Sequence, residues 1–145
     1  MNPMDVKPES ILPHREPMLL IDAILWLDDR CAVTRSVVAE KWPLCDGRKA
    51  SPIVLIELVA QTSGIHNGFI REKKEGRAAG THGWIVGVRQ ARFEVDGLPV
   101  GAELVTRAEN QMEFEGFRDI GGTVAMGGRR VAQIALQLLR AASSG

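Results

Sequence analysis

Glu57 is the one carboxylate within an apolar stretch, Ile53–Ala60. Burial of a charged carboxylate is costly unless the group is paired or protonated, and a buried carboxyl group favours its protonated form. A group in that state can give or take a proton near neutral pH, so Glu57 is a candidate for acid–base chemistry. Spacing alone leaves a second interpretation open, in which Glu57 pairs with an arginine across an interface.

Glu57 also belongs to a polar stripe of the helix that this stretch predicts. Gln61, Gly64 and Gly68 follow it at intervals of four, three and four residues, which places all four residues on one helix face. The glycines of the stripe would admit a neighbouring backbone. This face is therefore where we expect either the chemistry or a close packing contact.

The predicted helix has clear ends and is apolar almost all round. Ser51 suits the N-cap and Pro52 the first helical position, whereas the charged run 71–75 and Gly76 mark the end. Apolar residues between 53 and 69 fall on nearly every side, which is typical of a helix wrapped by other structure.

Strand patterns occupy the rest of the chain. The segments predicted as strands are 19–27, 31–40, 84–95, 102–115, 123–126 and 131–139. Turns are expected at 28–30, 96–99 and 127–128, and an irregular loop at 41–51. The fourth strand alternates with charged positions, and its predicted inward residues are Leu104, Thr106, Ala108, Met112 and Phe114. The pattern predicts one α+β domain over residues 1–145, in which two strands and a meander of about four form an antiparallel sheet around one long helix.

Composition limits the possible partners. The 145 residues carry 18 Lys+Arg and 18 Asp+Glu, and a net charge of zero provides no field to hold nucleic acid. Two cysteines and three histidines do not suggest a disulfide scaffold or a metal site. No segment resembles a signal peptide or is long enough to cross a bilayer, so we expect a cytoplasmic protein with no membrane partner.

Two sequence blocks, Leu12–Asp22 (LPHREPMLLID) and Val54–Gln61 (VLIELVAQ), resemble the 3-hydroxyacyl-(acyl-carrier-protein) dehydratases. The resemblance continues through Gly87–Phe93, Pro99–Leu104 and the last hairpin, so it covers nearly the whole chain. It is closer still to a divergent branch of predicted dehydratases encoded with aryl-polyene or polyketide-like synthases. The resemblance implies a hotdog fold, a sheet wrapped around a central helix, and dehydration of 3-hydroxyacyl thioesters in fatty-acid or polyketide-like synthesis, without a cofactor.

In that family the catalytic pair is a helix Glu or Asp and a His in a preceding Gly-His-Phe-Pro loop. Glu57 matches the acid, but Lys41 stands where the family has its histidine. For the second proton-transfer group we therefore rank His14 first, His82 second and Lys41 third. Lys41 comes last because a lysine base would have to lose its proton through burial.

The resemblance also implies residues that bind substrate. The N–H groups of Ile53 and Val54 at the helix start would polarise the thioester carbonyl. Further contacts are expected from Pro13, Gln61 and Trp84, the last at the place of an aromatic gate. The third histidine, His66, is expected to pack or face solvent, since it cannot easily share the site of Glu57.

The partners implied are an acyl carrier protein or coenzyme A thioester, and a second copy of the chain in a homodimer or higher homo-oligomer. An acidic carrier protein could meet the basic residues Arg71, Lys73, Lys74, Arg77, Arg129 and Arg130, although such charges are more often simply solvated. Two other functions stay open. One is a non-catalytic acyl-binding subunit of a heteromeric dehydratase, and the less favoured one is a hotdog thioesterase.

Overall fold

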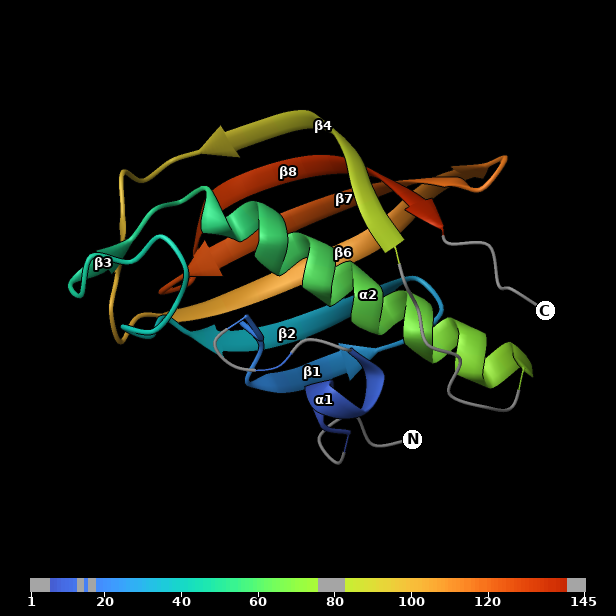
Figure 1. Ribbon diagram of the computed structural model, residues 1–145, viewed down its shortest axis with the longest axis horizontal. Coiled ribbons are helices and arrows are strands. Elements are labelled where there is room, and N and C mark those ends of the chain that lie inside the picture. Colours follow the sequence, from blue (N-terminus) through green and yellow to red (C-terminus); the bar gives the residue numbers. More distant parts are fainter. Residues whose placement is uncertain (1–5, 13–14, 16–17, 76–82, 141–145) are drawn as a thin grey trace.

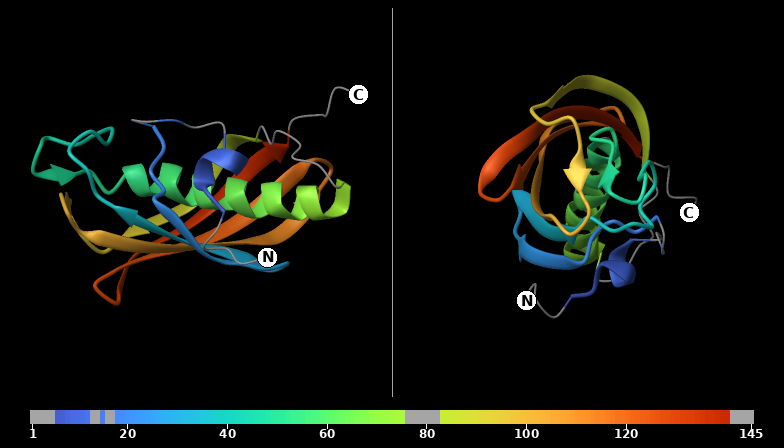
Figure 2. Two further views of the ribbon diagram at one scale, coloured as in Figure 1. Left: turned by 90° about the horizontal axis from the view of Figure 1, so that it is seen from below. Right: turned by 90° about the vertical axis from the view of Figure 1, so that its left-hand side faces the viewer.

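A curled antiparallel sheet surrounds one long helix (Figures 1 and 2). The computed structural model describes residues 6–12, 15, 18–75 and 83–140. Its elements are α1 (Pro8–Ile11), β1 (Ala23–Leu27), β2 (Cys31–Val37), β3 (Lys49–Ala50), α2 (Val54–Glu75), β4 (Gly83–Phe93), β5 (Leu98–Pro99), β6 (Glu103–Phe114), β7 (Phe117–Met126) and β8 (Arg129–Arg140). This confirms the predicted α+β class and the central helix.

The sheet order is β1-β2-β6-β7-β8-β4, with β3 and β5 as a separate pair. The predicted meander is wrong in one respect, because β4 pairs with β8 instead of β6. After β4 the chain crosses the end of the molecule, where β5 pairs with β3, and only then enters β6 beside β2. Such a pairing joins segments that are far apart in the sequence, so no local sequence pattern predicts it.

Several strand ends differ from the prediction. The first strand begins at Ala23 instead of residue 19, because the backbone before it is held by a side chain of α2. The second strand ends at Val37 instead of residue 40. The strand predicted for 123–126 is much longer and begins at Phe117. The hairpin at 127–128 is confirmed, and both glycines have positive φ, 60° and 78°, as a tight two-residue turn requires.

The helix packs into the concave face of the sheet through its apolar residues. Leu55, Leu58 and Val59 are fully buried there. A Cβ atom on Gly122 of β7 would collide with the side chain of Val59, so the missing side chain sets the close approach of helix and sheet. Leu104 on β6 is likewise buried, as the alternation predicted.

The far end of β6 departs from that alternation. Met112 and Phe114, predicted to face the interior, are 64% and 67% exposed. A bulge between Asn110 and Met112 shifts the register with β7 by one residue. Because side chains alternate between faces, this shift moves the following residues to the outer face.

None of the helices within the described residues is both long and apolar enough to cross a membrane.

Candidate active site

Glu57 lies in the first turn of α2 and is half-buried. Its Oε1 atom accepts a hydrogen bond of 3.1 Å from Nε2 of Gln61, one helical turn further on. An amide donor of this kind fixes the direction of the carboxylate.

Gln61 also binds the backbone of the segment before β1. Its side chain is almost fully buried, at 1% exposure, and its Oε1 atom accepts the backbone N–H of Leu20 at 3.0 Å. Its Nε2 group also donates to the carbonyl of Met18 at 2.7 Å. Both amide hydrogens are thus used, one by Met18 and one by Glu57. Gln61 therefore ties the segment that precedes β1 to the carboxylate on α2.

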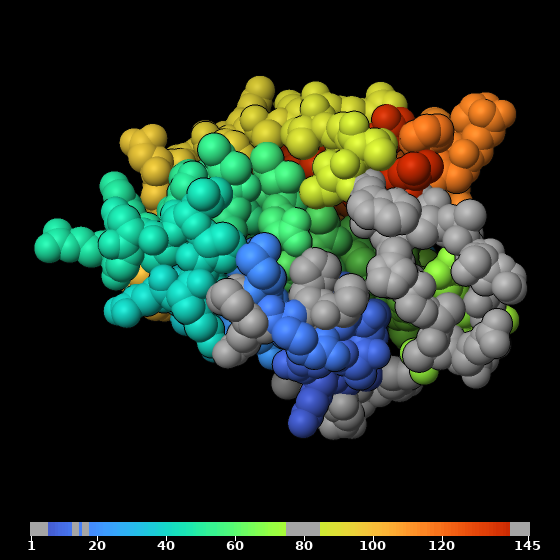
Figure 3. Space-filling view, viewed as in Figure 1, coloured from blue at the N-terminus to red at the C-terminus, as the bar shows by residue number. Residues whose placement is uncertain are grey.

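The N-terminal segment crosses the same face of α2 (Figure 3). A Cβ atom on Gly64 would lie 2.9 Å from Cδ2 of Leu12, so the glycine forms a notch that this leucine fills. Arg15 donates from Nη1 to the carbonyl of Leu12 at 2.8 Å. The polar stripe predicted from sequence is thus a docking face for the segment, with Glu57 at one end.

The start of α2 is capped by Ser51. Its hydroxyl accepts the N–H of Ile53 at 3.3 Å and its carbonyl accepts the N–H of Val54 at 3.1 Å. The helix itself begins at Val54, two residues after the first helical position predicted at Pro52, and Ser51 caps the turn at 52–53 that leads into it. These bonds also mean that both N–H groups expected to polarise a thioester already have a partner, which a bound substrate would have to share or displace.

The other site residues predicted from sequence are not brought together within the described part of the chain. His14, His82 and Pro13 lie outside the described residues, and so does the side chain of Trp84, whose backbone belongs to β4. Lys41 is described and is solvent-exposed, so it lacks the burial on which its candidacy depended. Among the described residues, no group of three or more His, Cys, Asp or Glu side chains could hold a metal ion.

His66 packs in the interior, which is one of the two environments expected for it. It is 1% exposed and lies nine positions beyond Glu57, against the turn between β1 and β2. Sequence spacing indicated correctly that it does not share the site of Glu57. Its contact with a turn 38 residues away could not be predicted from the neighbouring sequence.

The chain matches the family described as ApeP-like, ApeP dehydratase, over residues 6–144. It is 30% identical over 135 residues to the 3-hydroxyacyl-(acyl-carrier-protein) dehydratase FabZ of Chlamydia muridarum, covering 86% of this chain and 77% of that protein. The FabZ of Acinetobacter baylyi is 28% identical over 151 residues, covering 95% and 97%.

Solved structures show the same fold. The dehydratase heterocomplex ApeI:P of Xenorhabdus doucetiae has a chain with a TM-score of 0.83 at 21% identity, covering 96% of this chain and 93% of that one. A hypothetical thioesterase of Streptococcus pneumoniae TIGR4 with coenzyme A has a TM-score of 0.61 at 15% identity, covering 92% and 90%. At these identities the likeness concerns the fold, which the sheet wrapped around α2 already indicated.

Proposed function

Because the chain belongs to the ApeP-like dehydratase family, we propose that it dehydrates 3-hydroxyacyl thioesters. A base removes a proton from C2 of the acyl chain, and an acid protonates the 3-hydroxyl group, which leaves as water. The electrons of the C2–H bond form the C2=C3 double bond. The FabZ relatives, which are named 3-hydroxyacyl-(acyl-carrier-protein) dehydratases, support this substrate class.

The observation that carries the proposal is the contact between Glu57 and Gln61. It orients a half-buried carboxylate on the central helix, where one proton-transfer group of the reaction is needed. Gln61 acts as a positioning residue in this scheme, because its own hydrogen bonds go to the protein. A contact between Gln61 and substrate stays a prediction.

His14 is our first choice for the second proton-transfer group. The residues on either side of it are anchored to the helix face that carries Glu57, Leu12 in the notch at Gly64 and Met18 on Gln61. His14 lies two positions from the first anchor and four from the second, which is a short stretch of chain. His82 ranks second, and the exposed Lys41 ranks third.

The thioester carbonyl would be polarised at the start of α2 by the N–H groups of Ile53 and Val54. The helix dipole favours negative charge at this point. Pro13 and Trp84 complete the proposed substrate contacts. The thioester carrier would be an acyl carrier protein or coenzyme A, and such substrates would place the enzyme in the cytoplasm.

We also propose that the open edge of β4 pairs with a second hotdog chain, in a homodimer or a larger homo-oligomer. Three apolar side chains on this edge strand, Ile85, Val86 and Val88, are 39%, 46% and 46% exposed. An exposed apolar edge is an aggregation hazard unless another strand covers it. A strand of a second subunit would cover these apolar side chains and form hydrogen bonds with the backbone groups at the edge of β4.

The second candidate is a non-catalytic acyl-binding subunit of a heteromeric dehydratase. The presence of exposed Lys41 at the position of the family's histidine favours it. The likeness to a chain of the ApeI:P heterocomplex agrees with it. In that case the partner subunit would supply the missing proton-transfer group, and Glu57 would have no catalytic role in this chain alone.

The test is the reversible hydration of an enoyl thioester by the purified protein, followed by loss of the enoyl absorbance. Glu57→Gln and His14→Ala should each lower the rate by about 100-fold or more, since a general acid or base contributes that much. Glu72→Gln, on the same helix, removes an equal charge and should leave the rate unchanged. If the His14 variant keeps its activity, the second group is His82 or Lys41.

Inactivity of the folded wild-type protein on both carrier-protein and coenzyme A thioesters would refute the catalytic proposal. The subunit hypothesis then predicts that the chain copurifies with a second hotdog protein, and that activity depends on the pair.

A further inference from the structure

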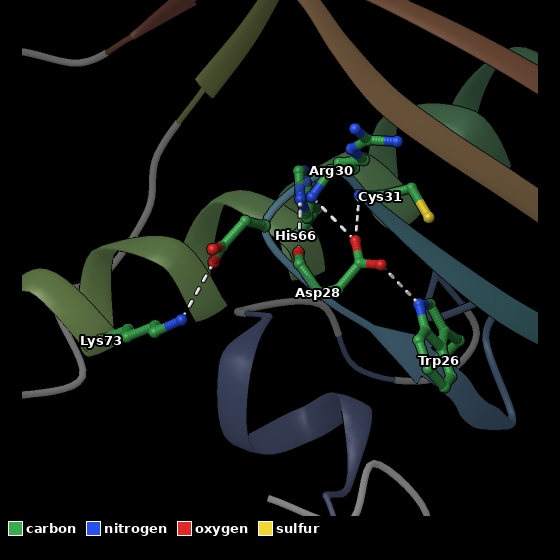
Figure 4. A network of polar contacts seen from close by, with 7 residues as sticks. Trp26, Asp28, Arg30, Cys31, His66 and Lys73 are labelled. Carbon is green, nitrogen blue, oxygen red and sulfur yellow. Dashed lines mark hydrogen bonds and ion pairs between the residues drawn. The ribbon is translucent and has the colours of Figure 1, made fainter.

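The turn between β1 and β2 is built around the carboxylate of Asp28 (Figure 4). Its Oδ2 atom accepts the indole N–H of Trp26 at 2.8 Å. Its Oδ1 atom accepts the backbone N–H groups of Arg30 and Cys31 at 2.8 and 2.9 Å. The Trp26 bond, followed by the two backbone bonds, lowers the pKa of Asp28 to about 2. The turn therefore carries a fixed negative charge at neutral pH.

His66 connects this turn to the second half of α2. Its Nε2 atom lies 3.0 Å from the backbone carbonyl oxygen of Asp28. Because a carbonyl oxygen only accepts hydrogen bonds, Nε2 must carry the hydrogen, and in the neutral ring Nδ1 then holds a lone pair. Nδ1 is buried and finds no hydrogen-bond partner among the described residues. The site thus fits the neutral imidazole.

The charged groups that face His66 come from three elements. The turn provides Asp28 and Asp29, β7 provides Arg118, and Lys73 of α2 is held by Asp29 at 3.1 Å. Burial of the ring opposes its charged form more than the aspartates favour it, and the pKa of His66 is lowered from 6.5. The backbone of Asp29 also favours the charged form of the ring, but less than burial opposes it.

We propose that His66 is an acid-sensitive latch, whose protonation releases the β1–β2 turn from α2. The imidazolium gains hydration only if the turn moves away, because His66 is 1% exposed in the closed arrangement. The ion pair of Lys73 with Asp29, which also joins the turn to α2, is exposed and holds the turn weakly. Since the closed state binds fewer protons than the open one, it is favoured at higher pH and lost as pH falls below 6.5.

Nuclear magnetic resonance on the full chain tests this proposal directly. The ring of His66 would be titrated while nuclear Overhauser effects between the side chain at position 66 and the backbone of Asp28 are followed, because only the closed arrangement holds these groups in contact. We expect these effects to weaken about tenfold or more between about pH 8 and about pH 5. The loss should follow the titration of the His66 ring.

Two variants sharpen the result. His66→Gln can still donate to the Asp28 carbonyl but does not titrate, so the contact between position 66 and the turn should become independent of pH. Lys73→Met removes the exposed ion pair and should keep the pH dependence of the wild type. A contact that persists in the wild type at about pH 5, or an unchanged pH dependence in the glutamine variant, would overturn the latch.

Discussion

Replacement of Gln61 by leucine would remove three hydrogen bonds while nearly preserving the side-chain volume. The partners left behind are the N–H of Leu20, the carbonyl of Met18 and the carboxylate of Glu57. Leu20 is 1% exposed, so water cannot easily replace the lost acceptor. The bond at Met18 is only partly buried, and its carbonyl can be rehydrated.

The expected loss of stability follows from these environments. An unpaired buried N–H costs about 1–3 kcal/mol, and the loss of a partly buried hydrogen bond adds about 1 kcal/mol. The extra apolar surface of leucine returns about 1 kcal/mol. The free energy of unfolding should therefore fall by about 1–3 kcal/mol, and the melting temperature by about 3–12 °C for a chain of this size.

Thermal and urea unfolding of the wild type and Gln61→Leu would measure this loss. Gln133→Leu is a matched control, because Gln133 is exposed on β8 and its replacement should change stability by less than about 0.5 kcal/mol. Equal stability of the two variants would refute the role of Gln61 as the tie between α2 and the segment before β1.

Three further results are expected. Gly122→Ala should lower the urea midpoint by an amount equivalent to about 1–3 kcal/mol, because the new methyl group meets Val59. Gly87→Ala is the control and should leave the urea midpoint unchanged, because the nearest neighbour of its methyl group would be 3.9 Å away. Asp28→Asn should lower the melting temperature near neutral pH, and the difference from wild type should shrink as pH falls from 3.8 to about 2, where the wild-type carboxylate becomes protonated; a difference independent of pH would contradict the assigned bonds. Val88→Lys should shift the protein from oligomer to monomer in light scattering, whereas an unchanged mass would argue against pairing along β4.

Much of the fold follows from local sequence signals. The apolar stretch bounded by Ser51–Pro52 and by the charged run 71–75 predicted α2 to within two residues at its start and to the residue at its end, and Gly127–Gly128 predicted the last hairpin. The partner of β4 could not be predicted in this way, because strand pairing across the sheet depends on contacts between distant segments. The bulge after Asn110 escaped prediction as well, since one extra residue reverses the side-chain faces without changing the apolar pattern.

The candidate site was predictable where it depends on helical spacing, but not where it depends on contacts between distant segments. Helical spacing placed Glu57 and Gln61 on one face, and the structure joins them. Helical spacing could not indicate that Gln61 also binds the backbone at Met18 and Leu20, more than 40 residues away in the chain. For the same reason the sequence could not choose between packing and exposure for His66, because its partner is a backbone carbonyl of a distant turn.

The notch at Gly64 has a consequence for how this sequence can diverge. A methyl group at position 64 would meet the end of the Leu12 side chain, which a shorter residue at position 12 would avoid. The two positions should therefore covary among relatives, with a smaller residue at 12 wherever 64 is not glycine. The N-terminal segment and the central helix would then evolve as one unit, although 51 residues lie between the two positions.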